Sequence, residues 1–138
     1  MKKLFLTCLA AVSITACTSV AKVERLAISS AETNAIERAT RDVLVHPESA
    51  KFRNIHQNRI SYSDGKSIVR ACGEVSAVTA GGFQGGFRPF VVTLKDGEYL
   101  VNAVAMPDTP HDQRPSGRVG ATEAHFVRGL CYDDVFRN

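Results

Sequence analysis

Near its centre the chain reads Ser63-Asp64-Gly65-Lys66-Ser67-Ile68-Val69-Arg70-Ala71-Cys72-Gly73-Glu74-Val75, a turn signal that leads into a long alternating segment. Asp64-Gly65 supplies the positive-φ residues that a tight hairpin turn requires. Residues 67–79 alternate with period two, which is typical of a strand. One face of that strand carries Val69, Ala71, Gly73, Val75 and Ala77. We expect residues 53–62, before the turn, to form its antiparallel partner.

Two more strands are expected towards the C-terminus. Residues 90–95 and 99–105 both alternate apolar with polar or small side chains, and Asp96-Gly97 between them is a second hairpin signal. Residues 106–120 are rich in Pro, Asp, Gly and Arg, which indicates a loop. Residues 121–131 follow this loop, and their apolar spacing predicts a short helix.

A helix is predicted before the first hairpin, over residues 31–45. Ser29-Ser30 offers an N-cap for this helix. Glu37 and Arg41 are four residues apart, a spacing that favours an ion pair on the helix surface. Pro47 ends the pattern, because the residue before a proline disfavours the helical conformation. The apolar face of the helix contains Ile36, Ala39 and Val43.

Together these elements predict an α+β fold in two layers, namely an N-terminal helix, a four-stranded antiparallel meander and a short C-terminal helix. They form a single domain over residues 29–138. Two positions break the simple alternation. Ile55 is out of phase with the rest of its strand, which suggests a bulge or an edge position. Cys72 faces away from Val69 and Val75, so either both sheet faces are covered or the strand bulges near Gly73.

The N-terminus has the pattern of a secretory signal peptide. Lys2 and Lys3 give it a positive start, an apolar run follows over residues 4–14, and the small Ala16 precedes Cys17. The apolar run is about eleven residues long, too short to cross a bilayer core of ~30 Å. The sequence therefore predicts removal of residues 1–16.

Ile14-Thr15-Ala16-Cys17 resembles the lipobox of bacterial lipoproteins. This resemblance implies acylation of Cys17, cleavage before it, and membrane lipid as a partner. Residues 17–28 would then be a lipid-anchored tether. Thr18, rather than Asp, follows the cysteine, which resembles the default for sorting to the outer membrane in Gram-negative bacteria. The alternative is an ordinary secreted protein in which Cys17 is a free thiol.

The other cysteines follow from this assignment. Cys8 would leave with the signal peptide, and Cys72 and Cys131 remain in an oxidising compartment, where we predict that they form a disulfide. A redox-active or metal-binding pair is the alternative. It has less support, because no Cys-x-x-Cys spacing is present.

Composition and motifs argue against several classes of function. Removal of residues 1–16 leaves 122 residues, enough for one domain, and lowers the net charge from +3 to +1. With no long basic run, nucleic-acid binding has little support. The sequence contains no phosphate-binding loop, no zinc-binding histidine spacing and no Gly-x-Ser-x-Gly elbow. It therefore predicts no catalytic residue, no metal site and no cofactor.

The segment Gly81-Gly82-Phe83-Gln84-Gly85-Gly86-Phe87 is the most unusual local feature. One interpretation is an exposed loop whose phenylalanines are anchors for a partner. The alternative is a long hairpin connection in which glycines allow left-handed backbone and the phenylalanines enter the core. The residues predicted to bind a partner are Phe83, Gln84, Phe87 and Arg88.

Three segments, one of which contains this loop, resemble small bacterial envelope proteins and lipoproteins of uncharacterised activity. They are Pro47 to Arg53, Cys72 to Val75, and Gly81 to Phe90. The resemblance implies no activity. We therefore expect a non-enzymatic binding or accessory lipoprotein of the outer membrane, with an envelope protein as partner. The alternatives are an inhibitor or immunity protein against a periplasmic hydrolase, and a small enzyme that uses Glu74 with a histidine.

Overall fold

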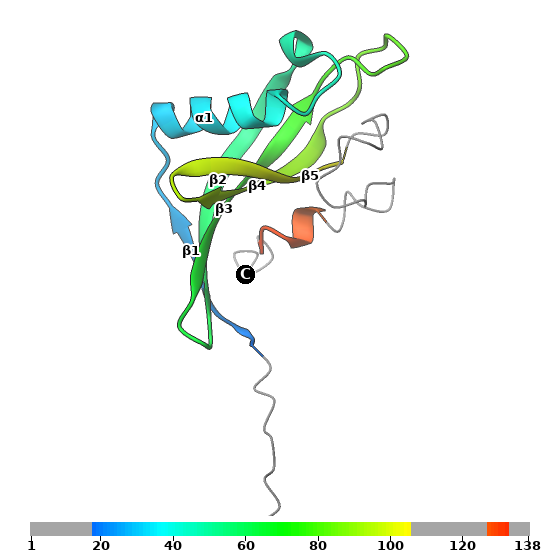
Figure 1. The fold of residues 1–138 in the computed structure, drawn as a ribbon. Helices are drawn as coiled ribbons and strands as arrows, with labels where there is room; N and C mark the ends of the chain where they lie inside the picture. The colour runs from blue at the N-terminus through cyan, green and yellow to red at the C-terminus, as the bar shows by residue number, and fades with distance from the viewer. Residues whose placement is uncertain (1–17, 106–126, 133–138) are drawn as a thin grey trace, which may run out of the picture.

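Figure 1 shows a computed structural model of the chain, in which residues 18–105 and 127–132 are described. One long antiparallel sheet dominates the described part, and residues 127–129 form a short helical turn. The elements are β1 (Val20–Leu26), α1 (Ser30–Arg41), the 3₁₀ turn η1 (Pro47–Ser49), β2 (Lys51–Tyr62), β3 (Ser67–Ser76), β4 (Arg88–Lys95) and β5 (Glu98–Val104).

The predicted fold class is wrong. The chain is mainly β: five antiparallel strands lie in the order β1-β2-β3-β4-β5, so the sheet is not a four-stranded meander behind an N-terminal helix. The additional strand is β1, which lies within residues 17–28, the segment predicted to be a tether. Its partly buried residues are three apart (Val20, Val23 and Leu26), so the sequence lacks the alternation of period two. Backbone pairing with β2 makes it a strand.

The start of α1 follows the sequence closely. Ser29 is the N-cap, and its hydroxyl accepts a hydrogen bond from the backbone N–H of Glu32 while the Glu32 carboxylate accepts from the Ser29 N–H at 2.8 Å. This reciprocal capping box satisfies two donors that a helix end leaves free. The predicted pair of Glu37 and Arg41 is also present, with 3.3 Å between nitrogen and oxygen.

The helix ends at Arg41, earlier than the apolar pattern predicts. Beyond it the backbone closes into tighter turns, in which the N–H of Leu44 donates to the carbonyl of Arg41. Leu44 is thereby buried in the core, and the Arg41 guanidinium donates to the carbonyls of Pro47 and Ala50 at 3.0 and 3.1 Å. Arg41 therefore fixes η1 against the end of the helix.

Both hairpins and the irregular strand are as predicted, although in the first turn Gly65 alone, and not Asp64, has a positive φ. Gly65 has φ +84°, and Asp96 and Gly97 have φ +52° and +85°, the left-handed conformations that these turns require. Between Arg53 and His56 the pairing of β2 with β3 shifts register, and Asn54 has φ +56°. This β-bulge explains why Ile55 is out of phase.

Side chains are buried on both faces of the sheet, which resolves the unusual orientation of Cys72. One face packs against α1, with Ile36 and Phe90 fully buried. The other face is covered in part by residues 127–131, with Val127 against it. The α1 side contains Ile36, Leu44, Ala50, Ala71, Val75, Ala77, Phe90, Val92 and Val104. The opposite side contains Cys72, Val91, Ala105, Val127 and Cys131.

Gly73 pairs with Phe90 of β4 on the α1 side of the sheet. A Cβ atom at this position would lie 2.9 Å from the ring of Phe90, closer than real side chains approach one another. The Phe90 ring packs edge to face on Phe52 with 5.8 Å between centroids. The glycine thus lets Phe90 lie flat against β3 beneath the helix.

Candidate functional site

The glycine-aromatic loop, residues 77–87, is a small hairpin closed by backbone hydrogen bonds, not an irregular connection. The backbone N–H of Thr79 donates to the carbonyl of Phe83 at 2.8 Å, and the N–H of Gly82 donates to the carbonyl of Thr79 at 2.9 Å. Gly82 has φ +82°, a conformation that glycine adopts at little cost. Phe83 is therefore held at the tip of a defined turn.

Side chains fix the base of this loop. The Gln84 amide donates to the Ser76 hydroxyl at 2.6 Å, and that hydroxyl donates to the carbonyl of Gly85 at 2.6 Å. The N–H of Val78 donates to the Ser49 hydroxyl at 2.8 Å, which connects the loop to η1. The Gln84 side chain, predicted to contact a partner, is thus used within the loop itself.

Phe83 has the most exposed large apolar side chain among the described residues. It is 77% exposed, compared with 48% for Leu100 and 40% for Val45. Folding gains almost nothing from an aromatic ring left in water, since the hydrophobic contribution scales with buried area. For Phe83 the core-packed interpretation of the loop is therefore wrong.

Phe87 and Arg88, the other two predicted contact residues, lie on opposite faces of the sheet. The Phe87 ring is half-buried, and the Arg53 guanidinium stacks 4.0 Å from its centroid. Arg88 opens β4 opposite Val75, so it points towards the α1 side, and it is exposed. A partner seated on the loop tip therefore meets Phe83 first.

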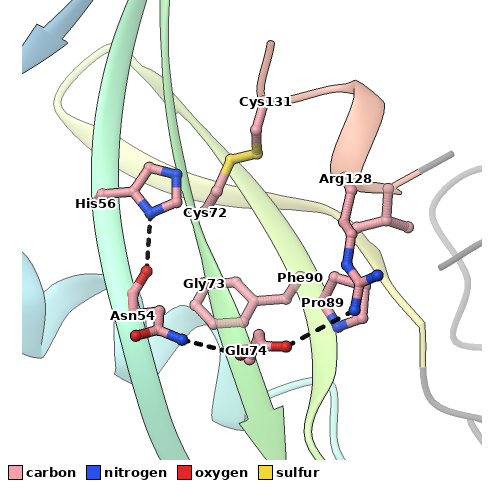
Figure 2. Close-up of a pocket in the computed structure, with 10 residues that line it drawn as sticks. Asn54, His56, Cys72, Gly73, Glu74, Pro89, Phe90, Arg128 and Cys131 are labelled. Carbon is pink, nitrogen blue, oxygen red and sulfur yellow. Dashed lines mark hydrogen bonds and ion pairs between the residues drawn. A yellow bond between two sulfur atoms is a disulfide. The ribbon is translucent and has the colours of Figure 1, made fainter. Parts of the chain in front are cut away.

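Next to Phe87, Glu74 is the centre of a charged cluster. Its carboxylate accepts a hydrogen bond from the Arg53 side chain at 2.8 Å. It also accepts from the Asn54 amide at 3.0 Å, and Arg128 lies 3.8 Å away (Figure 2). The hydrogen bond from Arg53 holds the pKa of Glu74 below its usual range, although partial burial opposes this. Glu74 is therefore ionised at neutral pH and holds three donors together.

A pocket of about 170 Å³ lies beside this cluster, between the sheet and residues 127–131 (Figure 2). Its lining combines apolar residues, among them Phe90 and Val127, with the disulfide and with polar side chains. The lining residues are Asn54, His56, Cys72, Gly73, Glu74, Pro89, Phe90, Val127, Arg128 and Cys131. Such a space can hold a small group with an apolar body and a polar end.

Glu74 and His56 line the same pocket, as the hypothesis of an enzyme that uses Glu74 with a histidine requires. The His56 ring nitrogen Nδ1 lies 2.8 Å from the carbonyl oxygen of Asn54, and the Glu74 carboxylate is engaged by Arg53 and Asn54. A carboxylate with a lowered pKa is a poor proton donor and a weak base near neutral pH. Through these contacts Glu74 connects the bulge of β2 to Arg128.

The predicted disulfide between Cys72 and Cys131 is present. The two Cα atoms are 6.3 Å apart, within the normal range, and both residues are buried. Two polar contacts accompany it: the Asn58 amide donates to the carbonyl of Cys131 at 2.7 Å, and Arg70 donates to the carbonyl of Leu130 at 2.8 Å. The C-terminal segment is thus fastened to β2 and β3.

The partners of Glu74 were not predicted from the sequence. Arg53 faces Glu74 only through the register of β2 with β3, and Arg128 reaches it only through the disulfide-linked segment. One local signal pointed to Asn54: Ile55 is out of phase with the alternation of its strand and marks the bulge. That bulge also turns Asn54 towards Glu74. Neither arginine carries such a signal.

Two further findings concern the described residues alone. Across residues 18–105 and 127–132, no three His, Cys, Asp or Glu side chains gather as metal ligands would. No helix in the same ranges has the length and apolar character needed to span a bilayer. Cys17, the predicted lipid site, lies outside the described residues, as does most of the predicted helix over residues 121–131.

Compared with protein-family models, curated protein sequences and solved structures, the chain gives no match. The resemblances to a lipobox and to small envelope proteins therefore stay predictions.

Proposed function

We propose that this protein is an outer-membrane lipoprotein, anchored through acylated Cys17, that binds an envelope protein without catalysing a reaction. The exposure of Phe83 at the tip of a pinned loop carries this proposal. Aromatic side chains dominate the energetics of protein interfaces, because each buries a large apolar area with few rotatable bonds.

The hydrogen bonds at the loop base add to the expected affinity. Ordering a flexible loop during association costs free energy, and a loop that is already fixed avoids much of that cost. The bonds from Gln84 and Val78 hold this loop in the free protein. The backbone at Phe83 is therefore already fixed for insertion of the ring into an apolar pocket of the partner.

The test is cross-linking in cells, followed by purification of the protein and identification of what it retains. Phe83→Ala should reduce recovery of the partner about 30-fold, corresponding to ~2 kcal/mol for an interface anchor. Leu100→Ala is the matched control, because Leu100 is the next most exposed large apolar residue and lies on β5. Equal recovery with Phe83→Ala and the unchanged protein would contradict binding through the loop.

The same loop supports a second candidate, an inhibitor or immunity protein against a periplasmic hydrolase. A fixed hairpin with one aromatic residue at its tip suits insertion into an active-site cleft. Purified full-length protein would then lower the activity of a cell-wall hydrolase from the same cells, and Phe83→Ala would abolish that effect. Inhibition that persists in Phe83→Ala would exclude the loop as the inhibitory element.

A further inference from the structure

The two long central strands give the molecule two distant ends. β2 contains twelve residues, and at ~3.3 Å per residue a strand of that length spans roughly 40 Å. At one end lies the β2–β3 hairpin, residues 62–66, and at the other lie η1 and the glycine-aromatic loop. Figure 1 shows the N-terminal segment entering the sheet beside the hairpin and the loop at the opposite end.

The folded body begins immediately after the predicted lipid site. The Ser63 N–H donates to the carbonyl of Ser19 at 2.8 Å, and the Ser19 N–H donates to the Ser63 hydroxyl at 3.0 Å. Val20 then pairs with Tyr62. The chain is thus fastened to the hairpin from Ser19 onward, with Thr18 alone between Ser19 and Cys17.

We infer that the β2–β3 hairpin rests in the phospholipid headgroup layer of the membrane that holds Cys17. This rests on the proposed acylation of Cys17. Two extended residues reach about 7 Å, and the headgroup layer of one leaflet is about 5–8 Å thick. The reach and the thickness are about equal, so the chain holds Ser63 within the headgroup layer or at its outer edge.

The side chains at this end suit that location. Lys66 is 83% exposed, and its ammonium lies 3.5 Å from the Asp64 carboxylate. Lys22 on β1 is 68% exposed, and Tyr62 is half-buried. Tyrosine and lysine are favoured where a protein meets lipid headgroups, because each combines an apolar body with a polar end. With Lys66 balanced by Asp64, the anchor supplies the attachment and the hairpin sets the orientation.

One consequence concerns the partner. A sheet standing on this hairpin holds Phe83 roughly 40 Å from the headgroups, the approximate length of β2. The proposed partner therefore meets the loop from the aqueous side and not within the bilayer. A binding site formed by membrane-embedded segments does not reach it.

The experiment uses full-length acylated protein in vesicles of phosphatidylethanolamine and phosphatidylglycerol that contain a headgroup-attached spin label. A fluorophore is placed at Lys66→Cys or at Lys51→Cys, a matched pair because both are exposed positions near opposite ends of the β2–β3 pair. The label at residue 66 should lose most of its emission, and the label at residue 51 should lose none. Equal emission from both would overturn the inference.

A second variant separates this inference from the proposed anchoring. Twelve Gly and Ser residues inserted between Cys17 and Thr18 give a flexible spacer of about 20 Å, and quenching at residue 66 should then fall sharply. Mass spectrometry of the N-terminal peptide reports acylation independently. Without the spacer, acylated protein with an unquenched residue 66 refutes only the hairpin contact. Protein without lipid refutes the anchoring as well.

Discussion

The two faces of the sheet are covered in different ways. On the α1 side, a capped helix contributes Ile36, and the turn after it contributes Leu44, to the largest apolar cluster of the described residues. On the other side, the short segment 127–132 adds few apolar side chains and is held by a disulfide and by bonds from Asn58 and Arg70. Burial therefore stabilises the first face, whereas a covalent bond and polar contacts stabilise the second.

The largest effect is expected from removing the bridge. Cys72→Ser combined with Cys131→Ser should lower the free energy of unfolding by about 4 kcal/mol, since the bridge closes a long loop in the unfolded chain. Urea unfolding of the two proteins measures this loss. Hydrogen exchange should show residues 127–132 unprotected and α1 unchanged. Retained protection of that segment would mean that the polar contacts suffice.

A smaller effect is expected from truncating the helix contact. Ile36→Ala should cost about 3 kcal/mol, because it leaves a cavity between α1 and the sheet. Val127→Ala is the comparison on the other face, where loss of about two methylene equivalents should cost about 1.5 kcal/mol. Urea denaturation of both variants decides the order. If Val127→Ala lowers the free energy of unfolding as much as Ile36→Ala or more, the two faces do not differ in how much burial stabilises them.

The smallest effect concerns the charged cluster on the second face. Glu74 has a lowered pKa in the folded protein, so its contribution is present above the unfolded pKa and is lost as pH falls through the folded pKa. Glu74→Gln should cost about 1 kcal/mol at pH 7, since Arg53 and Arg128 are largely exposed. The difference from the unchanged protein should vanish in acid.

Unfolding free energies measured from neutral pH to about pH 3 provide the test. Glu24→Gln is the control, because Glu24 is half-exposed and both of its ion pairs are 3.8 Å long. This control should change stability little at any pH. A pH-independent loss for Glu74→Gln would show that packing, and not the ionised carboxylate, is responsible.

Local chemistry made part of the fold predictable. Asp64-Gly65 and Asp96-Gly97 determine their turns, Ser29 with Glu32 determines where α1 starts, and Ile55 marks the bulge. Each of these signals acts over a few residues. The pairing of Cys72 with Cys131 was also predictable, because the expected removal of Cys8 and acylation of Cys17 leave one pair of thiols.

Features that depend on distant pairing were not predictable. β1 has no alternation of its own, and hydrogen bonds to β2 make it a strand. Arg53 and Arg128 approach Glu74 through register and through the bridge. For the loop, the glycines indicated a turn, but only the fold shows that Phe83 is exposed and Phe87 is half-buried.

The bridge from Cys72 to Cys131 spans 59 residues and joins the middle of the sheet to its last described segment. A chain that crosses a membrane from its N-terminus delivers all five strands before Cys131 arrives. If the chain is exported as proposed, the bridge can form only after all five strands have emerged, so it does not guide their order. If Cys17 is acylated, no competing thiol remains, so maturation requires an oxidant and no disulfide isomerase.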